Sequence, residues 1–509
     1  MATASVAAGG APQSPGVIDK GLKKNAIGFL SNLVIGVAST APAYSLAATL
    51  GFIVAVSGVG VHAPAVLLVS FIPMLLIAFA YRYLNRADPD AGTTFAWTTR
   101  ALGPGLGWVN GWVIFLADVL VMASLAQIAG RYTFLLFGWD SAAESTGAVI
   151  AASVIWIALM TWICYRGIEL SARVQQVLLS AEILILTVFA VVALVKVYGS
   201  SPAGSIKPEL SWFNPFAMGF SPLVEGILLG VFIYWGWDSG VAVNEESEDA
   251  NEGPGRAAVL STIVLLLIYL VVSAAGQAYH GTGFLENNAE DVLSALGSPV
   301  LGSGLDKLLI IAVLTSASAS TQTTILPTAR TTLSMAHWKA IPAAFGRVHK
   351  RYLTPSFSTL LMGGISIVWT VVLLLLSESA LGDSIIAIGF PICFYYGFTG
   401  VACVVFYRHE IFRSARNFLM LGLLPLAGAL ILFGVFGKAL SFYAEAANVE
   451  SAPILGITLP IWIGIGGILI GVVLMLVARP FFREFFARRL ETARPGLLEE
   501  PVEHAPAHF

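Results

Sequence analysis

Charged side chains are scarce in this sequence. Only 11% of its 509 residues are Asp, Glu, Lys or Arg, whereas 57% are hydrophobic. A soluble domain carries roughly a quarter charged residues, and a single soluble core could not bury this much apolar surface. The composition therefore excludes an ordinary soluble protein. It predicts an integral membrane protein whose solvent is the lipid bilayer.

Cysteine and metal-ligand patterns are scarce as well. The three cysteines, Cys164, Cys393 and Cys403, lie in or beside apolar segments and form no disulfide framework. The seven histidines are scattered without the spacing of metal ligands. Neither a metal site nor a cofactor is therefore expected, and a membrane enzyme is disfavoured. A channel is disfavoured too, because the sequence has no repeated filter motif.

Long apolar segments fill most of the chain. A membrane-spanning helix needs about 20 apolar residues. Twelve candidates lie near residues 27–55, 62–84, 106–130, 147–165, 172–197, 221–245, 257–279, 303–335, 355–377, 382–407, 417–437 and 457–479. The expected fold class is an all-α integral membrane protein with about 12 transmembrane helices. The first helix is expected to act as an uncleaved insertion signal, because residues 1–26 lack the charged-then-apolar pattern of a cleaved one.

The placement of positive charge predicts the orientation of these helices. If the N-terminus is cytoplasmic, five of the 27 lysines and arginines lie on the outer side, namely Arg131, Lys196, Lys207, Lys307 and Lys438. The other 22 then lie in cytoplasmic loops and tails, as the positive-inside rule requires. We therefore expect a multi-pass protein of the cytoplasmic membrane with both termini in the cytoplasm.

Two of the apolar segments carry helix breakers at matching places. In residues 221–245, Gly236 and Gly240 bracket a Trp-Asp-Ser step, and Pro42 interrupts residues 27–55. Unwound backbone at membrane depth is tolerated only where it lines a cavity or is buried in protein. An ordinary kink in each helix is the plainer alternative. A binding site built on two broken helices is the interpretation that we favour.

The breaks fall in the first and the sixth segments, which suggests an inverted repeat of five plus five helices. Two further helices would then lie outside the repeat. The expected division is a cytoplasmic N-terminal tail 1–26, a membrane domain 27–479 (first repeat 27–198, second repeat 221–407, helices 11 and 12 at 417–479) and a cytoplasmic C-terminal tail 480–509.

Three acidic side chains lie at membrane depth without a Lys or Arg at comparable depth to pair with. They are Asp118, Glu182 and Asp238. An ionised carboxylate is costly there, and either a proton or a bound cation or amine relieves the cost. Asp118 and Glu182 are therefore candidates for a coupling role. A structural hydrogen bond from a neighbour is the alternative for each.

A stripe of small hydroxyl residues runs along segment 303–335. It contains Ser316, Ser320 and Thr324, which lie on one face of a helix. Such a stripe can coordinate an ion, or it can let two helices pack closely. Both interpretations stay open for Ser316 and Ser320.

Four short motifs stand out along the chain. They are residues 88–97 (Asp-Pro-Asp-Ala-Gly-Thr-Thr-Phe-Ala-Trp), 102–112, 234–240 with the following Asn244-Glu-Glu, and 329–336 running on to Pro342 and Thr354-Pro355. In this order and at these topological places they resemble the amino acid–polyamine–organocation (APC) superfamily of secondary transporters, of the bacterial amino acid permease type. The resemblance covers residues 24–479.

The resemblance implies that a substrate binds between the breaks of helices one and six. Backbone amides of helix one would receive a carboxylate, and carbonyl groups of helix six would receive an amine. The positions carried over are Ser39, Thr40, Ala41, Trp235, Gly236, Trp237 and Asp238. Helix one departs from the family pattern, because Ser-Thr-Ala-Pro replaces the usual glycine pair. Helix five departs as well, with Glu182 where some proton-coupled relatives have lysine.

The expected function is secondary active transport of amino acids or related amines across the cytoplasmic membrane by alternating access, with proton coupling. A permease for cations or other small solutes on the same scaffold is the alternative, since acids without basic partners also suit an inorganic cation. The expected partners are a small-molecule amino acid or amine, a proton or sodium ion, and the lipid bilayer. No nucleic-acid partner is expected.

Overall fold

A computed structural model describes residues 19–376, 378–449 and 451–493 of the chain. Over these ranges the regular secondary structure is helical. The described part contains isolated β-bridges but no β-strand. The prediction of an all-α membrane fold is confirmed.

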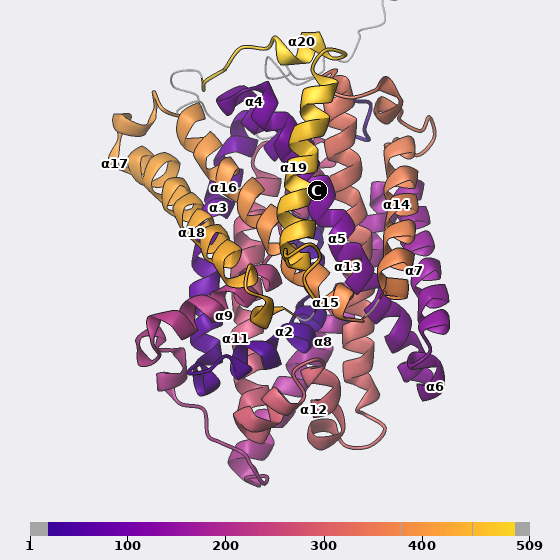
Figure 1. Cartoon of the computed structure of the whole chain (residues 1–509), viewed down its shortest axis with the longest axis vertical. Coiled ribbons are helices and arrows are strands. Elements are labelled where there is room, and N and C mark those ends of the chain that lie inside the picture. Colours follow the sequence, from indigo (N-terminus) through magenta and orange to yellow (C-terminus); the bar gives the residue numbers. More distant parts are fainter. Residues whose placement is uncertain (1–18, 377, 450, 494–509) are drawn as a thin grey trace, which may run out of the picture.

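The described residues form twenty α-helices that pack into one bundle, with α4 and α20 at one end of it and α6 and α12 at the other (Figure 1). They are α1 Phe29–Ser39, α2 Pro42–Ala55, α3 Ala63–Ala87, α4 Thr94–Leu102, α5 Pro104–Phe137, α6 Asp140–Ala143, α7 Thr146–Arg166, α8 Ile168–Gly199, α9 Phe220–Ile233, α10 Ser239–Ala242, α11 Gly253–Asn287, α12 Val292–Leu301, α13 Lys307–His337, α14 Ser356–Leu376, α15 Glu378–Ala387, α16 Gly389–Phe406, α17 Ala415–Asn417, α18 Leu424–Tyr443, α19 Leu459–Ala478 and α20 Arg483–Phe486.

Eleven helical stretches of the described chain are long and apolar enough to span a membrane. The pair α1 and α2 counts as one stretch, because only two residues separate the helices. The remaining expected crossing, near residues 221–245, is divided into α9 and the short α10, so neither helix reaches membrane-spanning length. Eleven of the twelve predicted crossings therefore correspond to helical stretches of membrane-spanning length, and the twelfth corresponds to α9 and α10. Two of the predicted crossings, the first and the sixth, are broken.

The first break lies between α1 and α2. Pro42 has no amide hydrogen to donate to the helix ladder. Ala41 adopts a left-handed conformation with φ 48° and ψ 66°, which is strained for a residue with a Cβ. The Thr40 hydroxyl turns back to donate to the carbonyl oxygen of Val37 at 2.7 Å. The helix therefore stops at Ser39 and restarts at Pro42.

The second break lies between α9 and α10. Gly236 has a φ of 118°, in the region that favours glycine. A Cβ at Gly236 would lie 2.8 Å from the carbonyl oxygen of Ser39, so glycine also lets the two breaks touch. The hydroxyl groups of Ser39 and Ser239 hydrogen-bond at 2.8 Å, although 200 positions separate them in the sequence. The two broken segments thus meet at one point.

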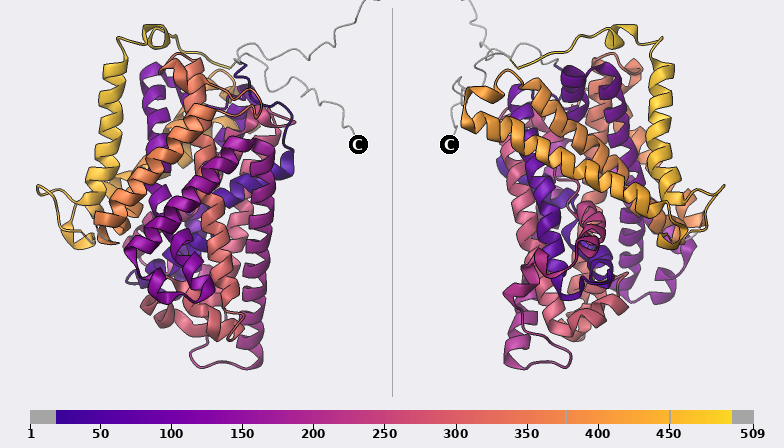
Figure 2. Two further views of the ribbon diagram at one scale, coloured as in Figure 1. Left: turned by 90° about the vertical axis from the view of Figure 1, so that its right-hand side faces the viewer. Right: turned by 60° about the vertical axis from the view of Figure 1, so that its left-hand side comes forward.

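The last two long helices lie at the side of the bundle. α18 crosses at a slant against α3 and α16, and α19 stands at the outer edge beside α5 and α15 (Figure 2). Gly467 lets α19 pack closely against α5, because a Cβ there would lie 2.6 Å from Cδ2 of Leu116. The carbonyl oxygen of Gly467 also accepts a hydrogen bond from the Trp112 indole at 2.9 Å.

The described parts of both expected tails pack against the bundle. Phe485 in α20 is fully buried and stacks on Phe95 in α4, with ring centroids 5.8 Å apart. The amide of Ala493 donates to the carbonyl oxygen of Phe406 at 3.0 Å. Lys20, before α1, is also buried. The rest of the expected tails, residues 1–18 and 494–509, lies outside the described residues.

Candidate functional site

A small cavity lies where the two breaks meet. Its volume is about 10 Å³, which is room for roughly one water-sized sphere. Two of its ten lining residues carry carboxylates, and none of the ten is Lys, Arg or His. The lining is Ser39, Ile114, Asp118, Trp235, Gly236, Asp238, Ser239, Thr324, Pro327 and Tyr395. The surrounding helices must separate before anything larger than water can bind there.

Three tyrosine hydroxyl groups hold the Asp238 carboxylate. Tyr396 donates to Oδ1 at 2.8 Å, and Tyr395 and Tyr81 donate to Oδ2 at 3.2 Å and 3.3 Å. Hydrogen bonds to an ionised acceptor are roughly twice as strong as neutral ones, and they offset part of the cost of burying the charge. The turn that follows at Asn244 contributes no side-chain bond to Asp238. The carboxylate thus faces the tyrosines and the cavity.

The two tryptophans of the break have different surroundings. Trp235 lines the cavity, and its indole N–H donates to the hydroxyl of Tyr395, which in turn donates to Asp238. Trp237 is fully buried and stacks on Tyr396, with ring centroids 5.2 Å apart and an angle of 19° between the rings. Trp235 can therefore touch a ligand in the cavity. Trp237 does not line the cavity but packs against Tyr396, one of the three tyrosines that bind Asp238.

The second carboxylate of the cavity is Asp118 in α5. It is 4% exposed and accepts a short hydrogen bond from the Thr328 hydroxyl through Oδ2. Among the described residues, its other oxygen has no hydrogen-bond donor. Asp118 is thus a nearly buried acid with one oxygen available to whatever fills the cavity.

Glu182 in α8 lies behind the first break rather than in the cavity. It is fully buried, and its Oε1 accepts a hydrogen bond from the amide of Ala43 at 2.7 Å. Its Oε2 is buried without a hydrogen-bond partner in the described chain. The carboxylate therefore caps the N-terminal end of α2, where a helix dipole favours negative charge.

The serine stripe of α13 connects to the first break. The hydroxyl of Ser316 accepts from the amide of Tyr44 at 3.2 Å, and the hydroxyl of Ser320 donates to the carbonyl oxygen of Ser39 at 2.8 Å. Thr324, one turn on, lines the cavity. These hydroxyl groups position the broken backbone of the first segment.

The structure brings together six of the residues singled out from the sequence, one of which is Thr324 of the hydroxyl stripe. Ser39, Asp118, Trp235, Gly236, Asp238 and Thr324 line one cavity. The other predicted site residues surround it without lining it: Thr40, Ala41, Glu182, Trp237, Ser316 and Ser320.

Sequence reasoning missed the three tyrosines that hold Asp238. They lie in α3 and α16, in segments that read only as apolar. A signal was present, because a buried tyrosine hydroxyl needs a partner and a buried carboxylate needs donors. The adjacent Tyr395 and Tyr396 carry that signal most clearly.

A buried charge cluster lies near the start of α4. Lys20 Nζ is 3.0 Å from Asp90 Oδ2 and also bonds to Glu245. Burial alone would lower the pKa of Lys20, but Asp90 and Glu245 outweigh that effect and raise it. Burial raises the pKa of Glu245 to about 7, although Lys20 opposes the rise. Lys20 therefore stays charged and ties the residues before α1 to those that follow α3 and α10.

A second buried ion pair lies nearby. Arg330 Nε in α13 is 2.6 Å from Glu246 Oε2, and the two side chains are 2% and 0% exposed. The backbone oxygen of Glu246 also accepts from the amide of Ala26 at 2.7 Å. The pair therefore joins α13 to the segment after α10 and to the residues before α1. From the sequence alone, Lys20 and Arg330 could be assigned only as positive charges near the membrane surface.

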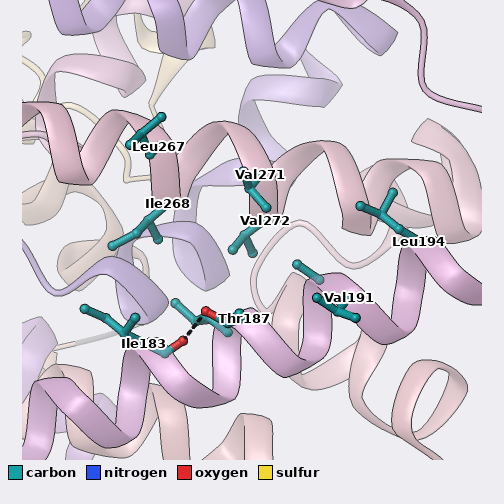
Figure 3. A pocket seen from close by; sticks show the side chains of 10 residues that line it. Ile183, Thr187, Val191, Leu194, Leu267, Ile268, Val271 and Val272 are labelled. Atoms are coloured by element: carbon teal, nitrogen blue, oxygen red, sulfur yellow. Dashed lines mark hydrogen bonds between the residues drawn. The ribbon is translucent and has the colours of Figure 1, made fainter.

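The apolar groove between α8 and α11 is much larger than the central cavity. Its volume is about 240 Å³, and Ile183, Val191, Leu267 and Val271 are among the side chains that line it (Figure 3). The hydroxyl of Thr187 is satisfied within α8, by the carbonyl oxygen of Ile183 at 2.7 Å. The groove has no converging polar groups, and its exposed apolar side chains suit contact with lipid tails.

Comparison with known proteins supports a transporter. The family model described as "Amino acid permease" matches residues 25–478. An arginine/ornithine antiporter of Latilactobacillus sakei is 24% identical over 60% of this chain and 64% of its own length. A branched-chain amino acid permease of Lactococcus lactis is 25% identical over 43% of this chain and 49% of its own. A methylthioribose transporter of Bacillus subtilis is 26% identical over 61% of this chain and 67% of its own.

The matched part of this chain spans between about half and two thirds of these relatives. The family model, in contrast, covers nearly the whole membrane region, from before α1 to the end of α19. The chain therefore belongs to the amino acid permease family, within the APC superfamily.

Proposed function

We propose that this chain is a secondary active transporter of amino acids or related amines across the cytoplasmic membrane, working by alternating access. The observation that carries the proposal is a cavity at the meeting point of two broken helices in a chain of the amino acid permease family. Broken helices near the bilayer midplane are a recurrent way of building a solute site in secondary transporters. The proposed binding residues are Ser39, Thr40, Ala41, Trp235, Gly236, Trp237 and Asp238.

The names of the relatives support solute transport without selecting one solute. They name arginine and ornithine, branched-chain amino acids and methylthioribose. Exchange in liposomes tests the proposal: vesicles that hold purified protein are loaded with an unlabelled amino acid or amine, and entry of the labelled compound is followed. We expect exchange for at least one compound of such a panel. Absence of exchange across the whole panel, with folded protein, would contradict the proposal.

The proposed topology places both ends of the chain in the cytoplasm, with two five-helix repeats at 27–198 and 221–407. Cysteines introduced at the exposed positions Ser200 and Glu286 should react with an impermeant thiol reagent added to intact cells. One introduced at the exposed Ala343 should react only after lysis, because that loop would be cytoplasmic. The three native cysteines are buried and give little background. The opposite labelling pattern would reverse the orientation.

Proton coupling is part of the proposal, with Glu182 and Asp118 as the candidate carriers. Glu182 makes its hydrogen bond to the Ala43 amide through one oxygen, and the other oxygen is buried without a partner. A proton on that second oxygen removes the buried charge while the first bond persists. Both protonation states are therefore compatible with the same local structure, which suits a group that takes up and releases a proton during transport.

Replacement of Glu182 by Gln tests this role. Glu182→Gln puts an NH2 group in place of the unpartnered oxygen and keeps the acceptor for Ala43, so it mimics the protonated form. We expect the initial rate of uptake to lose its pH dependence while the melting temperature stays close to wild type. Glu169→Gln, at an exposed acid of the same helix, is the matched control. A wild-type pH profile in Glu182→Gln would move the coupling to Asp118 or to a sodium ion.

A permease for inorganic cations or other small solutes is the second candidate. It is favoured by one observation: within the described residues, Asp118, Glu182 and Asp238 have no Lys, Arg or His partner. Uptake of a labelled monovalent cation that needs no organic solute would favour this candidate over amine transport.

A further inference from the structure

The N-terminal end of α2 is the natural place for a negatively charged group in this site. The first amides of a helix point outward without intrahelical acceptors, and the helix dipole adds partial positive charge. A solute carboxylate that reached the first break would bind there. The amides around this break therefore decide whether the site can receive a carboxylate.

Every amide around the first break already has an acceptor. Thr40 and Ala41 donate to carbonyl oxygens within α1, and Pro42 has no amide hydrogen. Ala43 donates to Glu182 and Tyr44 donates to the hydroxyl of Ser316. The amide of Ser45 donates to the carbonyl oxygen of Ala41 at 2.8 Å. No backbone amide of this break is left for a second carboxylate, because the chain's own Glu182 carboxylate fills the N-terminal end of α2.

The charge of the cavity also disfavours a solute carboxylate. Asp118 and Asp238 both line it, and none of the lining residues is basic. Asp118 is 4% exposed and has one oxygen without a hydrogen-bond donor in the described chain. A solute carboxylate would therefore meet two like charges and no free amide, whereas a cationic group would meet two acceptors.

We propose that the transported solute is an organic cation without a carboxylate beside its amine, and that a diamine or an amine with a guanidinium group fits best. One positive charge lies against Asp238 and the face of Trp235, and the other lies against Asp118. Glu182 acts as a built-in substitute for the carboxylate that an amino acid would bring. This substrate class rests on the proposed transport function.

Matched pairs of compounds test the substrate class with the wild-type protein in liposomes. Lysine is compared with cadaverine, and arginine with agmatine, since each pair differs only by the carboxylate. We expect the apparent affinity in uptake to favour the decarboxylated member by about tenfold or more, because like charges brought together in a buried site are strongly unfavourable. Equal affinity, or preference for the amino acid, would overturn the proposal.

Variants of Glu182 test whether this residue causes the preference for solutes without a carboxylate. Glu182→Ala frees the amide of Ala43, so it should improve the affinity for lysine relative to cadaverine. Glu182→Gln keeps an acceptor for that amide and should keep most of the wild-type preference, whether or not the pH dependence changes. Glu169→Ala, on the same helix, should leave the preference unchanged. An unchanged preference in folded Glu182→Ala would overturn the role given to Glu182.

The uptake experiments distinguish a failure of the proposed substrate class from a failure of the proposed transport function. Transport of amino acids but not of their decarboxylated partners would leave the transporter intact and refute the substrate class. Transport of neither class would refute both. Melting temperatures of all variants establish that a lost preference reflects the site and not unfolding.

Discussion

Replacement of Asp238 by Asn is expected to weaken the binding of a cationic solute by roughly thirtyfold to several thousandfold. Removing one partner of a desolvated charge pair typically costs about 2–5 kcal/mol, and about 1.4 kcal/mol corresponds to a factor of ten. Asp238 is buried and lines the cavity, and the only side-chain donors it has in the described chain are hydroxyl groups. A bound cation would therefore be its only charge partner.

Two further variants sharpen the Asp238 measurement. Asp238→Glu keeps the charge on a longer arm and should restore part of the affinity. Tyr396→Phe removes the closest hydroxyl, at 2.8 Å, and should change affinity less than the loss of the carboxylate. Asp140→Asn, at an exposed position beyond α5, is the control. Wild-type affinity in Asp238→Asn, with only a lower melting temperature, would give Asp238 a purely structural role.

Replacement of Glu246 by Gln is expected to cause the largest loss of stability. Breaking a fully buried ion pair by removing one charge costs about 3–5 kcal/mol, because the other charge stays buried and unpaired. Arg330 and Glu246 meet this condition, with 2% and 0% exposure and a distance of 2.6 Å. We expect a marked fall in the melting temperature of purified protein in detergent, measured by tryptophan fluorescence.

Two comparisons show whether the buried charge is the cause. The double variant Arg330→Met with Glu246→Leu removes both charges and should recover much of the lost stability. Glu484→Gln breaks the exposed pair with Lys339, where the side chains are 69% and 63% exposed, and should have little effect. Equal melting temperatures for Glu246→Gln and Glu484→Gln would contradict the account of the buried pair.

The sequence was informative where a single residue has a direct effect on the backbone. Pro42 cannot continue a helix, and Gly236 permits a conformation and a close approach that a Cβ would prevent, so both breaks could be placed. Asp238 and Asp118 could be identified as site candidates because a carboxylate at membrane depth is energetically costly and is usually functional. Twelve crossings were predicted from the lengths of apolar segments alone, and eleven helical stretches of the described chain have the required length and hydropathy.

The partners of these residues could not be predicted, because they depend on how each helix is rotated and which helices are neighbours. The tyrosines around Asp238 come from α3 and α16, and Glu182 reaches across from α8 to α2. Lys20 and Arg330 look like surface charges in the sequence, yet both are buried against acids from distant segments. Hydrophobic periodicity contains no information about such pairings.

Protection of a cysteine placed at Ser239 tests most directly whether the solute binds where the two breaks meet. Ser239 lines the cavity and bonds to Ser39, and a cysteine there is nearly the same size. A solute that the protein transports should slow the reaction of Ser239→Cys with a small thiol reagent in a concentration-dependent way. It should not slow the reaction of Ser200→Cys, which lies outside the site. Equal labelling rates at Ser239→Cys with and without a transported solute would contradict a site between the breaks.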